Sequence, residues 1–421
     1  MAGADNNDVV PFGHCYHCTV KILVIGSGGR EHALCWKLAQ SPGVEVFANP
    51  GNPGMALVAT CIPGEALDAA LAIRADLTVV GPEVPLVAGV VDAFRAQGLK
   101  IVGPDAEAAQ LEGSKIFAKN FFMKSGIPTA RYEAVDDPQQ ARAALSRFGF
   151  PVVLKADGLA AGKGVIIAQN AAEADAALET LKGAIVVEEF LTGQEVSFIA
   201  LCDGKDALPL AATQDHKAVF DGDRGPNTGG MGAYCASGIL SDADCQMVME
   251  RVIYPTVRAM NFTGFLYAGL MMTTEGPRVL EFNVRLGDPE TQPLMHRMKS
   301  DFVPALMAAA EGRLAGHTLE WNAGPSVCVV MTSAGYPGTF EAGKEILGVE
   351  QAEAHGAVVF QAGTRLLHGR LETAGGRVLG VTASGADLPA AIGMAYEAVA
   401  KIQFEGMHYR HDIARKGIIR G

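Results

Sequence analysis

The segment Lys155-Ala-Asp-Gly-Leu-Ala-Ala-Gly-Lys-Gly-Val165 places a lysine on an apolar strand and a second lysine, Lys163, in the glycine-rich loop that follows. Glycines let backbone N–H groups approach anionic oxygens, and the two lysines add point charges where a polyphosphate would lie. The spacing differs from G-x-x-x-x-G-K-[ST], which excludes a Walker A loop. The segment therefore indicates either a phosphate-binding loop or a Gly/Ala-rich hairpin with a solvated lysine.

A second polar constellation follows in residues 264–288. Two apolar strands flank a turn at Thr274-Glu-Gly-Pro277, which predicts an antiparallel hairpin. On the second strand Glu281, Asn283 and Arg285 are spaced by two and therefore share one face. That face is either a polar edge or a site where Glu281 and Asn283 offer hard oxygen ligands to Mg²⁺ and Arg285 reaches a phosphate or carboxylate. Together with the lysine loop, it favours the metal site.

Length and composition are consistent with a protein of several domains. The chain has 421 residues, of which 49% are hydrophobic, so it can bury more than one core. Its net charge is −12 and it has no basic block, which argues against a nucleic-acid surface. No run approaches the roughly 18 to 20 apolar residues of a membrane span. The scattered cysteines suit a reducing compartment, so we expect a cytoplasmic protein.

The sequence of the first part of the chain predicts a leader followed by an α/β layer. We expect residues 1–20 to be a disordered leader, and its His14-Cys-Tyr-His-Cys18 run lacks the spacing of a usual zinc site. Strands at 21–26, 44–48 and 77–80 alternate with helical stretches, which predicts a parallel sheet. The turn after the first strand is similar to a Rossmann loop, but Glu31 replaces its third glycine, which argues against dinucleotide binding.

Motifs spread over the whole chain then identify it as a member of the glycinamide ribonucleotide synthetase (phosphoribosylamine–glycine ligase) family of the ATP-grasp superfamily. The matching segments run in family order and lie at residues 24–33, 80–86, 110–115, 155–165, 187–191, 214–217, 225–234 and 281–292. The segment between Leu181 and Ile185 is shorter than in many members, which leaves that loop's contacts open.

The resemblance implies an α/β protein with α+β lobes. A Rossmann-like substrate domain at 21–124, with a helical stretch at 106–125, would precede an ATP-grasp domain at 125–324. This domain would comprise a nucleotide lobe at about 128–191 and a larger lobe at about 192–324, with ATP held between them. A small C-terminal α/β domain would occupy residues 325–421.

The resemblance also implies the nucleotide and metal site. The residues that meet or cover the ATP phosphates would be Lys115, Lys155, Gly162, Lys163 and Gly164. The strand of Glu188 and Glu189 would bind adenine and ribose, and Glu281 and Asn283 would ligate Mg²⁺ or Mn²⁺.

A further set of residues would bind the other substrates. It comprises Gly28, Gly29, Arg30, Glu31, Asn52, Glu83, Asp215, Lys217, Asn227, Gly229, Gly230, Arg285 and Asp288. The residues expected to take part in catalysis are Lys155, Lys163, Arg285 and Asp288.

The implied reaction is ATP-dependent ligation of glycine to 5-phosphoribosylamine through glycyl phosphate, in purine biosynthesis. Its partners would be small molecules, without nucleic acid or membrane, and the enzyme would be a monomer or homodimer. Two alternatives stay open: another ATP-grasp carboxylate–amine ligase or transformylase, and a non-catalytic nucleotide-binding protein. Release of ADP that depends on glycine rather than on formate or bicarbonate separates these possibilities.

Overall fold

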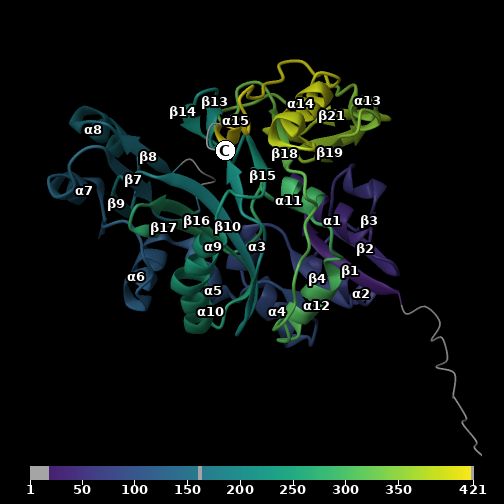
Figure 1. Ribbon diagram of the computed structural model, residues 1–421, viewed down its shortest axis with the longest axis horizontal. Helices are drawn as coiled ribbons and strands as arrows, with labels where there is room; N and C mark the ends of the chain where they lie inside the picture. Colours follow the sequence, from purple (N-terminus) through teal and green to yellow (C-terminus); the bar gives the residue numbers. More distant parts are fainter. Residues whose placement is uncertain (1–18, 160–163, 419–421) are drawn as a thin grey trace, which may run out of the picture.

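The computed structural model describes residues 19–159 and 164–418 (Figure 1). The expectations for the leader up to residue 18, for Gly162 and for Lys163 lie outside these residues. Within them the fold class expected from the sequence is confirmed, because a parallel α/β layer precedes two antiparallel sheets. No helix in the described ranges is long and apolar enough to cross a membrane.

The N-terminal unit, residues 20–102, is built on a five-stranded parallel sheet in the order β3-β2-β1-β4-β5. Its central strands are buried apolar runs, as expected when helices cover both faces of a parallel sheet. The strands are β1 (Val20–Gly26), β2 (Val44–Pro50), β3 (Thr60–Cys61), β4 (Leu77–Val80) and β5 (Ile101–Val102). The helices are α1 (Gly29–Leu38), α2 (Ala66–Ile73), α3 (Glu83–Val87) and α4 (Val90–Ala96), with a 3₁₀ turn at Met55–Leu57.

The helical stretch expected at 106–125 is divided into α5 (Ala106–Gly113) and α6 (Lys115–Ser125). Ser114 lies between them in an extended conformation, and its hydroxyl accepts a hydrogen bond from the Phe117 amide at 3.1 Å. This is an N-cap, which starts a new helix and sets its direction. Lys115 therefore occupies the first turn of α6.

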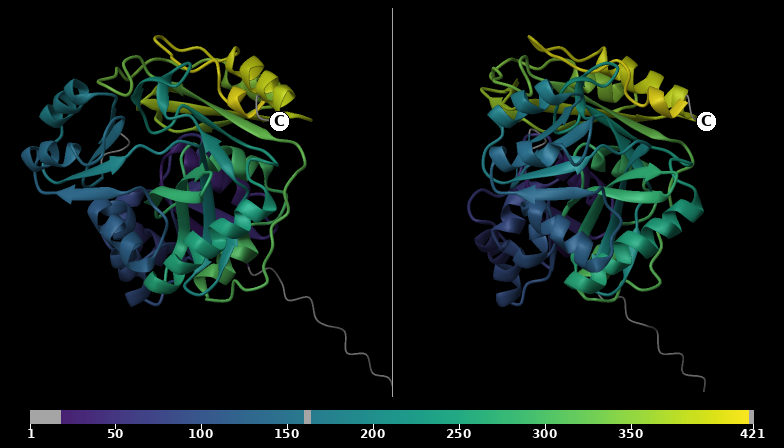
Figure 2. Two further views of the ribbon diagram at one scale, coloured as in Figure 1. Left: turned by 60° about the vertical axis from the view of Figure 1, so that its left-hand side comes forward. Right: turned by 90° about the vertical axis from the view of Figure 1, so that its left-hand side faces the viewer.

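The small lobe, residues 132–189, projects from the body of the molecule (Figures 1 and 2). Its antiparallel sheet has the order β6-β9-β7-β8, and two helices pack on it and on each other. The elements are β6 (Tyr132–Val135), α7 (Pro138–Leu145), β7 (Val152–Ala156), β8 (Val165–Ala168), α8 (Ala171–Thr180) and β9 (Ile185–Glu189). The lobe has its own hydrophobic core, formed only by its own residues.

A nine-stranded sheet forms the rest of the framework, in the order β17-β16-β10-β12-β15-β18-β22-β19 with β11 paired to β10. The strands are β10 (Gln194–Asp203), β11 (Ala207–Pro209), β12 (Thr213–Asp215), β15 (Gly232–Cys235), β16 (Thr263–Thr273), β17 (Gly276–Asn283), β18 (Ser326–Thr332), β19 (Val358–Gln361) and β22 (Arg377–Ser384). The C-terminal unit, residues 326–418, is thus joined to the larger lobe through β15 and β18, whereas sequence reasoning treated it as a separate unit.

The remaining elements surround this sheet. Two hairpins are β13 (Ala218–Phe220) with β14 (Arg224–Asn227), and β20 (Thr364–Leu367) with β21 (Arg370–Thr373). The helices are α9 (Asp242–Val248), a π-helical turn (Met249–Ile253), α10 (Tyr254–Met260), α11 (Thr291–Arg297), α12 (Val303–Ala310), α13 (Val349–Ala354), α14 (Leu388–Val399) and α15 (Arg415–Ile418).

The N-terminal unit and the large sheet meet at a close backbone approach. Gly264, near the start of β16, has a φ of +87°, and a Cβ atom there would lie 2.6 Å from the Cα of Gly103. Only glycine satisfies both the left-handed conformation and the contact. This position therefore fixes how the two units fit together.

We expect Gly264→Ala to destabilise the protein more than Gly98→Ala, which has a φ of +71° but open space around it. The control isolates the cost of the left-handed conformation, about 1–2 kcal/mol. Steric overlap in Gly264→Ala adds roughly 1–3 kcal/mol. Urea denaturation of both variants measures the difference, and equal midpoints would contradict the close approach.

Candidate functional site

Two lysines of the predicted phosphate site lie at the junction of α6, the small lobe and β17. Lys155 on β7 is 6% exposed, and its ammonium donates to the Leu280 carbonyl oxygen at 2.9 Å. Lys115 donates to the Gly158 carbonyl oxygen at 2.8 Å. At the other end of the predicted loop, the Gly164 carbonyl oxygen accepts from the Ala156 amide at 2.8 Å. Both ends of the glycine-rich loop are thus held beside these two lysines.

The neighbouring acids Glu188 and Glu189 have different surroundings. Glu188 is 1% exposed, and its Oε2 lies 3.1 Å from the ammonium nitrogens of both Lys119 and Lys155. Glu189 is less buried, and its carboxylate accepts a hydrogen bond from the Arg131 amide at 2.7 Å. Glu188 is therefore part of a cluster of charged side chains, whereas Glu189 lies towards the surface of the small lobe.

Glu281 and Asn283, the predicted metal ligands, lie two residues apart on β17. Glu281 faces Gly269 of β16, where a Cβ atom would approach the Glu281 side chain to 3.2 Å, so the glycine leaves room for the carboxylate. Asn283 Oδ1 accepts from Arg285 at 3.1 Å, which keeps Arg285 on this side although β17 ends at Asn283. The pair presents two hard oxygens of the kind that Mg²⁺ prefers.

Three lysines act electrostatically on the Glu281 carboxylate, and one of them contacts it. Lys217 is 3.4 Å from it and, more strongly than any other neighbour, lowers its pKa; Lys155 and Lys115 lower it further, although burial opposes them. Lys217 also binds Glu195 at 2.6 Å. Glu281 is therefore ionised at neutral pH and sits among the positive charges that a polyphosphate requires.

The segment around Asp215 and Lys217 connects this region to the predicted substrate loop. Asp215, at the end of β12, is buried, and burial raises its pKa to about 7 although Lys217 opposes the shift. The Lys217 carbonyl oxygen accepts from the Thr228 amide at 2.8 Å. Asn227 pairs with Ala218 in the β13–β14 hairpin. The loop that follows Asn227 is thereby held close to Lys217.

The C-terminal unit contacts the same loop. Arg377 donates to the Gly229 carbonyl oxygen at 2.5 Å, and the Tyr336 hydroxyl accepts from the Gly229 amide at 3.0 Å. Gly230 has a φ of +114°, and a Cβ atom there would lie 2.4 Å from Pro289. Both backbone groups of Gly229 are therefore bound by residues that lie over a hundred positions away in the sequence.

Gly28, Arg30 and Glu31 line a cavity of about 450 Å³ at the edge of the N-terminal sheet, together with Asp288. Glu31 accepts from the Gly28 amide at 2.6 Å and from Arg30 at 2.5 Å. A Cβ atom on Gly81 would overlap the Glu31 carboxylate, so Glu31 fills the space under this turn. The glutamate in place of the third Rossmann glycine thus orients Arg30.

Arg285 and Asp288 connect the cavity to the larger lobe. Arg285 binds Glu112 at 2.7 Å and lies 3.3 Å from Glu83. Asp288 accepts from Arg377 and from Gln292, both at 2.8 Å. The predicted catalytic pair is therefore held by acids of the N-terminal half and by a C-terminal arginine.

Asn52 and Gly29 lie behind the cavity wall. The Asn52 amide donates to the carbonyl oxygens of Ser27 and Gln361, both at 2.8 Å, and its own oxygen accepts from the Met55 amide at 2.9 Å. A Cβ atom on Gly29 would lie 2.8 Å from Gln292. Both residues shape the turn between β1 and α1 against the C-terminal half.

Sequence reasoning did not identify several residues that complete the site: Glu112, Lys119, Glu195, Gln292 and Arg377. Lys119 follows Lys115 by four residues, so helical periodicity would have placed both on one face of α6. The other four residues come from separate elements, and no sequence pattern around them indicated that they belong to the site.

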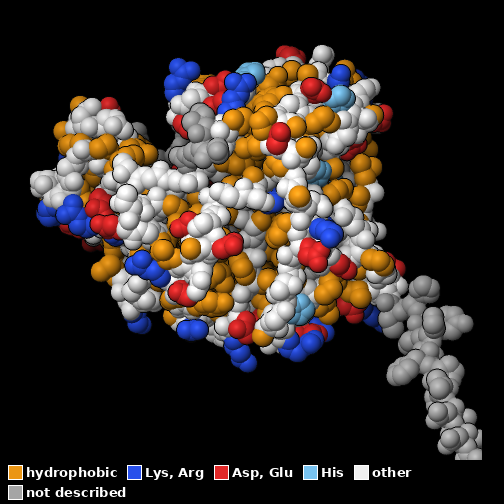
Figure 3. Space-filling view, in the orientation of Figure 1, with side chains coloured by type: hydrophobic (Ala, Val, Ile, Leu, Met, Phe, Trp, Pro, Cys, Tyr) orange, Lys and Arg blue, Asp and Glu red, His pale blue; other side chains and the backbone are white. Residues whose placement is uncertain are grey.

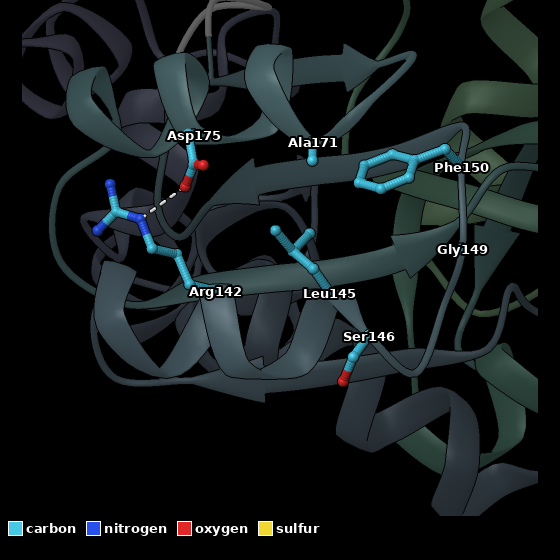
Figure 4. A pocket seen from close by; sticks show the side chains of 7 residues that line it. All are labelled: Arg142, Leu145, Ser146, Gly149, Phe150, Ala171 and Asp175. Atoms are coloured by element: carbon cyan, nitrogen blue, oxygen red, sulfur yellow. Dashed lines mark hydrogen bonds and ion pairs between the residues drawn. The ribbon is translucent and has the colours of Figure 1, made fainter.

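A second hollow, of about 590 Å³, lies between α7 and α8 of the small lobe (Figure 4). Its walls include Leu145, Phe150 and the ion pair of Arg142 with Asp175. None of the predicted site residues that the structure describes lines it. On the face of the molecule shown in Figure 3, acidic and basic side chains are interspersed.

Comparisons with known proteins agree with this geometry. Successive parts of the chain match the N domain, the ATP-grasp (A) domain and the C domain of phosphoribosylglycinamide synthetase, at residues 20–112, 113–291 and 326–416. Phosphoribosylamine–glycine ligases of Allochromatium vinosum and Escherichia coli (strain K12) are each 50% identical, over 95% of this chain and 99% of the relative.

Solved structures agree as well. Phosphoribosylamine–glycine ligase of Thermotoga maritima is 37% identical with a TM-score of 0.82, over 93% of this chain and 100% of that one. The biotin carboxylase domain of Hydrogenobacter thermophilus 2-oxoglutarate carboxylase shares the fold, with a TM-score of 0.70 at 16% identity over 92% and 91% of the two chains. The chain therefore belongs to the phosphoribosylglycinamide synthetase family.

Proposed function

We propose that the protein ligates glycine to 5-phosphoribosylamine with ATP, giving glycinamide ribonucleotide, ADP and phosphate in purine biosynthesis. The observation that carries the proposal is the Lys217–Glu281 contact at 3.4 Å beside Lys155, which is bound to the adjacent Leu280 carbonyl oxygen, while Lys155 and Lys115 also lower the Glu281 pKa. Polyphosphate, metal and a small polar substrate all find complementary groups there. The enzyme acts in the cytoplasm on small molecules, as a monomer or homodimer.

In the first step a carboxylate oxygen of glycine attacks the γ-phosphorus of ATP, and the bond to the β–γ bridging oxygen breaks. ADP leaves and glycyl phosphate forms. Catalysis of phosphoryl transfer rests mainly on positioning and charge neutralisation. Lys155 and Lys115 supply positive charge at the phosphates, and Lys217, between Glu195 and Glu281, lies where glycine would be held.

In the second step the amine nitrogen of phosphoribosylamine attacks the carbonyl carbon of glycyl phosphate. The carbon–oxygen bond to phosphate breaks, so the products are the amide, inorganic phosphate and a proton. The sugar phosphate occupies the 450 Å³ cavity, where Arg30 and the N-terminus of α1 face its phosphate. Asp288, which is held in place by Arg377 and Gln292, accepts a hydrogen bond from the amine.

The residues on β17 fit a divalent cation, because the Glu281 carboxylate is ionised and Gly269 leaves it room. When bound with ATP, Mg²⁺ or Mn²⁺ neutralises charge on the phosphates. Glu281 and Asn283 hold the cation, and Arg285 orients the Asn283 oxygen.

The assay that tests the function measures ADP with glycine and freshly generated phosphoribosylamine, omitting each in turn. We expect ADP formation to require glycine, and amide formation to require both. Formate or bicarbonate in place of glycine should give no ADP. Turnover with either of these instead would support the alternative ligases, and binding of Mg-ATP without turnover would support a non-catalytic protein.

Glu281→Gln should weaken retention of Mg²⁺ and lower kcat, because the hard cation loses an anionic ligand that the amide does not replace. The loss is roughly 100-fold, since such a metal stabilises transition-state charge by several kcal/mol. The matched control is Glu275→Gln in the exposed turn of the same hairpin. Wild-type rates for Glu281→Gln at low Mg²⁺ would remove Glu281 from the metal site.

Lys163→Ala should slow turnover roughly 100-fold by removing a phosphate cation. If the loop also keeps water from glycyl phosphate, this variant should release more phosphate per amide formed than the parent. Gly162→Val should act similarly by blocking close backbone approach. Phosphate and amide are measured in one reaction, with Lys182→Ala, an exposed lysine of the same lobe, as control. A one-to-one ratio in slow variants would show that the loop does not protect the intermediate.

A further inference from the structure

Lys119 is a buried lysine to which the proposed reaction gives no role. It lies on α6, is 3% exposed, and donates to the Thr129 hydroxyl at 2.7 Å. Its ammonium lies 5.9 Å and 5.5 Å from the ring centres of Phe122 and Tyr132. A buried ammonium is costly unless it is paired and hydrogen-bonded, so these contacts hold it in one place.

The partner that gives Lys119 its importance is Glu188. The ammonium nitrogens of Lys119 and Lys155 both lie 3.1 Å from Glu188 Oε2. Among the described residues, the other carboxylate oxygen, Oε1, has no hydrogen-bond partner. Two cations therefore share one anion, and the group of three carries a net charge of +1 when all are ionised.

The same lysines are both attached to β17. Lys155 donates to the Leu280 carbonyl oxygen, and Thr129, which accepts from Lys119, donates to the Val279 carbonyl oxygen at 2.7 Å. Leu280 and Val279 are adjacent and directly precede Glu281. The contacts therefore form a closed ring that runs from Lys119 through Glu188 and Lys155 to β17, and back through Thr129 to Lys119. It links α6 and the small lobe to the strand of the proposed metal ligands.

We propose that Lys119 is a positioning residue for the nucleotide phosphates. By sharing Glu188 with Lys155, it leaves Lys155 with positive charge for the polyphosphate and holds this ammonium beside the strand of Glu281. Without Lys119, Glu188 neutralises Lys155 alone and draws its ammonium towards the carboxylate. The inference rests on the proposed function, in which Lys155 contacts ATP phosphate.

The test compares Lys119→Met, which keeps chain length but removes the charge, with Lys124→Met, an exposed lysine at the end of the same helix. Full-length variants are assayed for kcat, for KM of ATP and glycine, and for inhibition by inorganic tripolyphosphate. Tripolyphosphate lacks adenine and ribose, so it reports on the phosphate contacts alone.

Lys119→Met should raise KM for ATP and the inhibition constant of tripolyphosphate together, by roughly tenfold for the loss of one charge-assisted contact. KM for glycine should stay within about twofold, because Lys217 and Glu195 are not part of the ring. Lys124→Met should match the parent in every constant. Equal rises in both KM values, or no change in tripolyphosphate binding, would overturn the proposal.

Glu188→Gln gives a second, independent result, which decides the matter if Lys119→Met does not fold. Removing the shared anion leaves at least as much positive charge at Lys155, so tripolyphosphate should bind as tightly as to the parent or more tightly. Weaker binding would overturn the proposal. Lys155→Met tests the assumption that Lys155 contacts the ATP phosphates. If this variant leaves KM for ATP unchanged, that assumption is wrong. If KM for ATP rises in Lys155→Met but not in Lys119→Met, only the role of Lys119 is refuted.

Discussion

The ion pairs of the half-buried Arg285 guanidinium are the interaction on which the rest of the site depends. The guanidinium binds Glu112 from α5, lies beside Glu83 from α3, and donates to Asn283 at the end of β17. Removing such a group from water is costly, and the two carboxylates and the amide oxygen offset that cost only in this one arrangement. Arg285 thereby links α3 and α5 to the end of β17, in addition to the close backbone approach at Gly264.

Local patterns in the sequence were sufficient for several elements, whereas most of the proposed site residues came from the family resemblance. The strand of Lys155, the hairpin of Glu281 and the glycine turn before Arg30 were predicted correctly as local structures, because each depends on residues adjacent in the chain. The break at Ser114 was missed, since one capping hydroxyl interrupts a run that is otherwise compatible with one helix.

The partners of these residues could not be predicted in the same way. Arg377 reaches Gly229 and Asp288 from β22, and Glu195 reaches Lys217 across β10 and β12, so each contact exists only after distant strands have paired. The pairing of β15 with β18 is the clearest case. It makes one sheet from two sequence regions, and the residue pattern of a strand does not identify a partner strand that is distant in the sequence.

The separate core of the small lobe also has a mechanical consequence. Among the residues that the structure describes, those that line the cavity near Arg30 belong to the N-terminal half or are Asp288, and none comes from 132–159 or 164–189. A rotation of the small lobe would break the contact of Lys155 with the Leu280 carbonyl oxygen, but it would leave the described lining of that cavity in place. In the proposed reaction, the nucleotide and the sugar phosphate are therefore bound by different parts of the molecule, and only the nucleotide side depends on the small lobe.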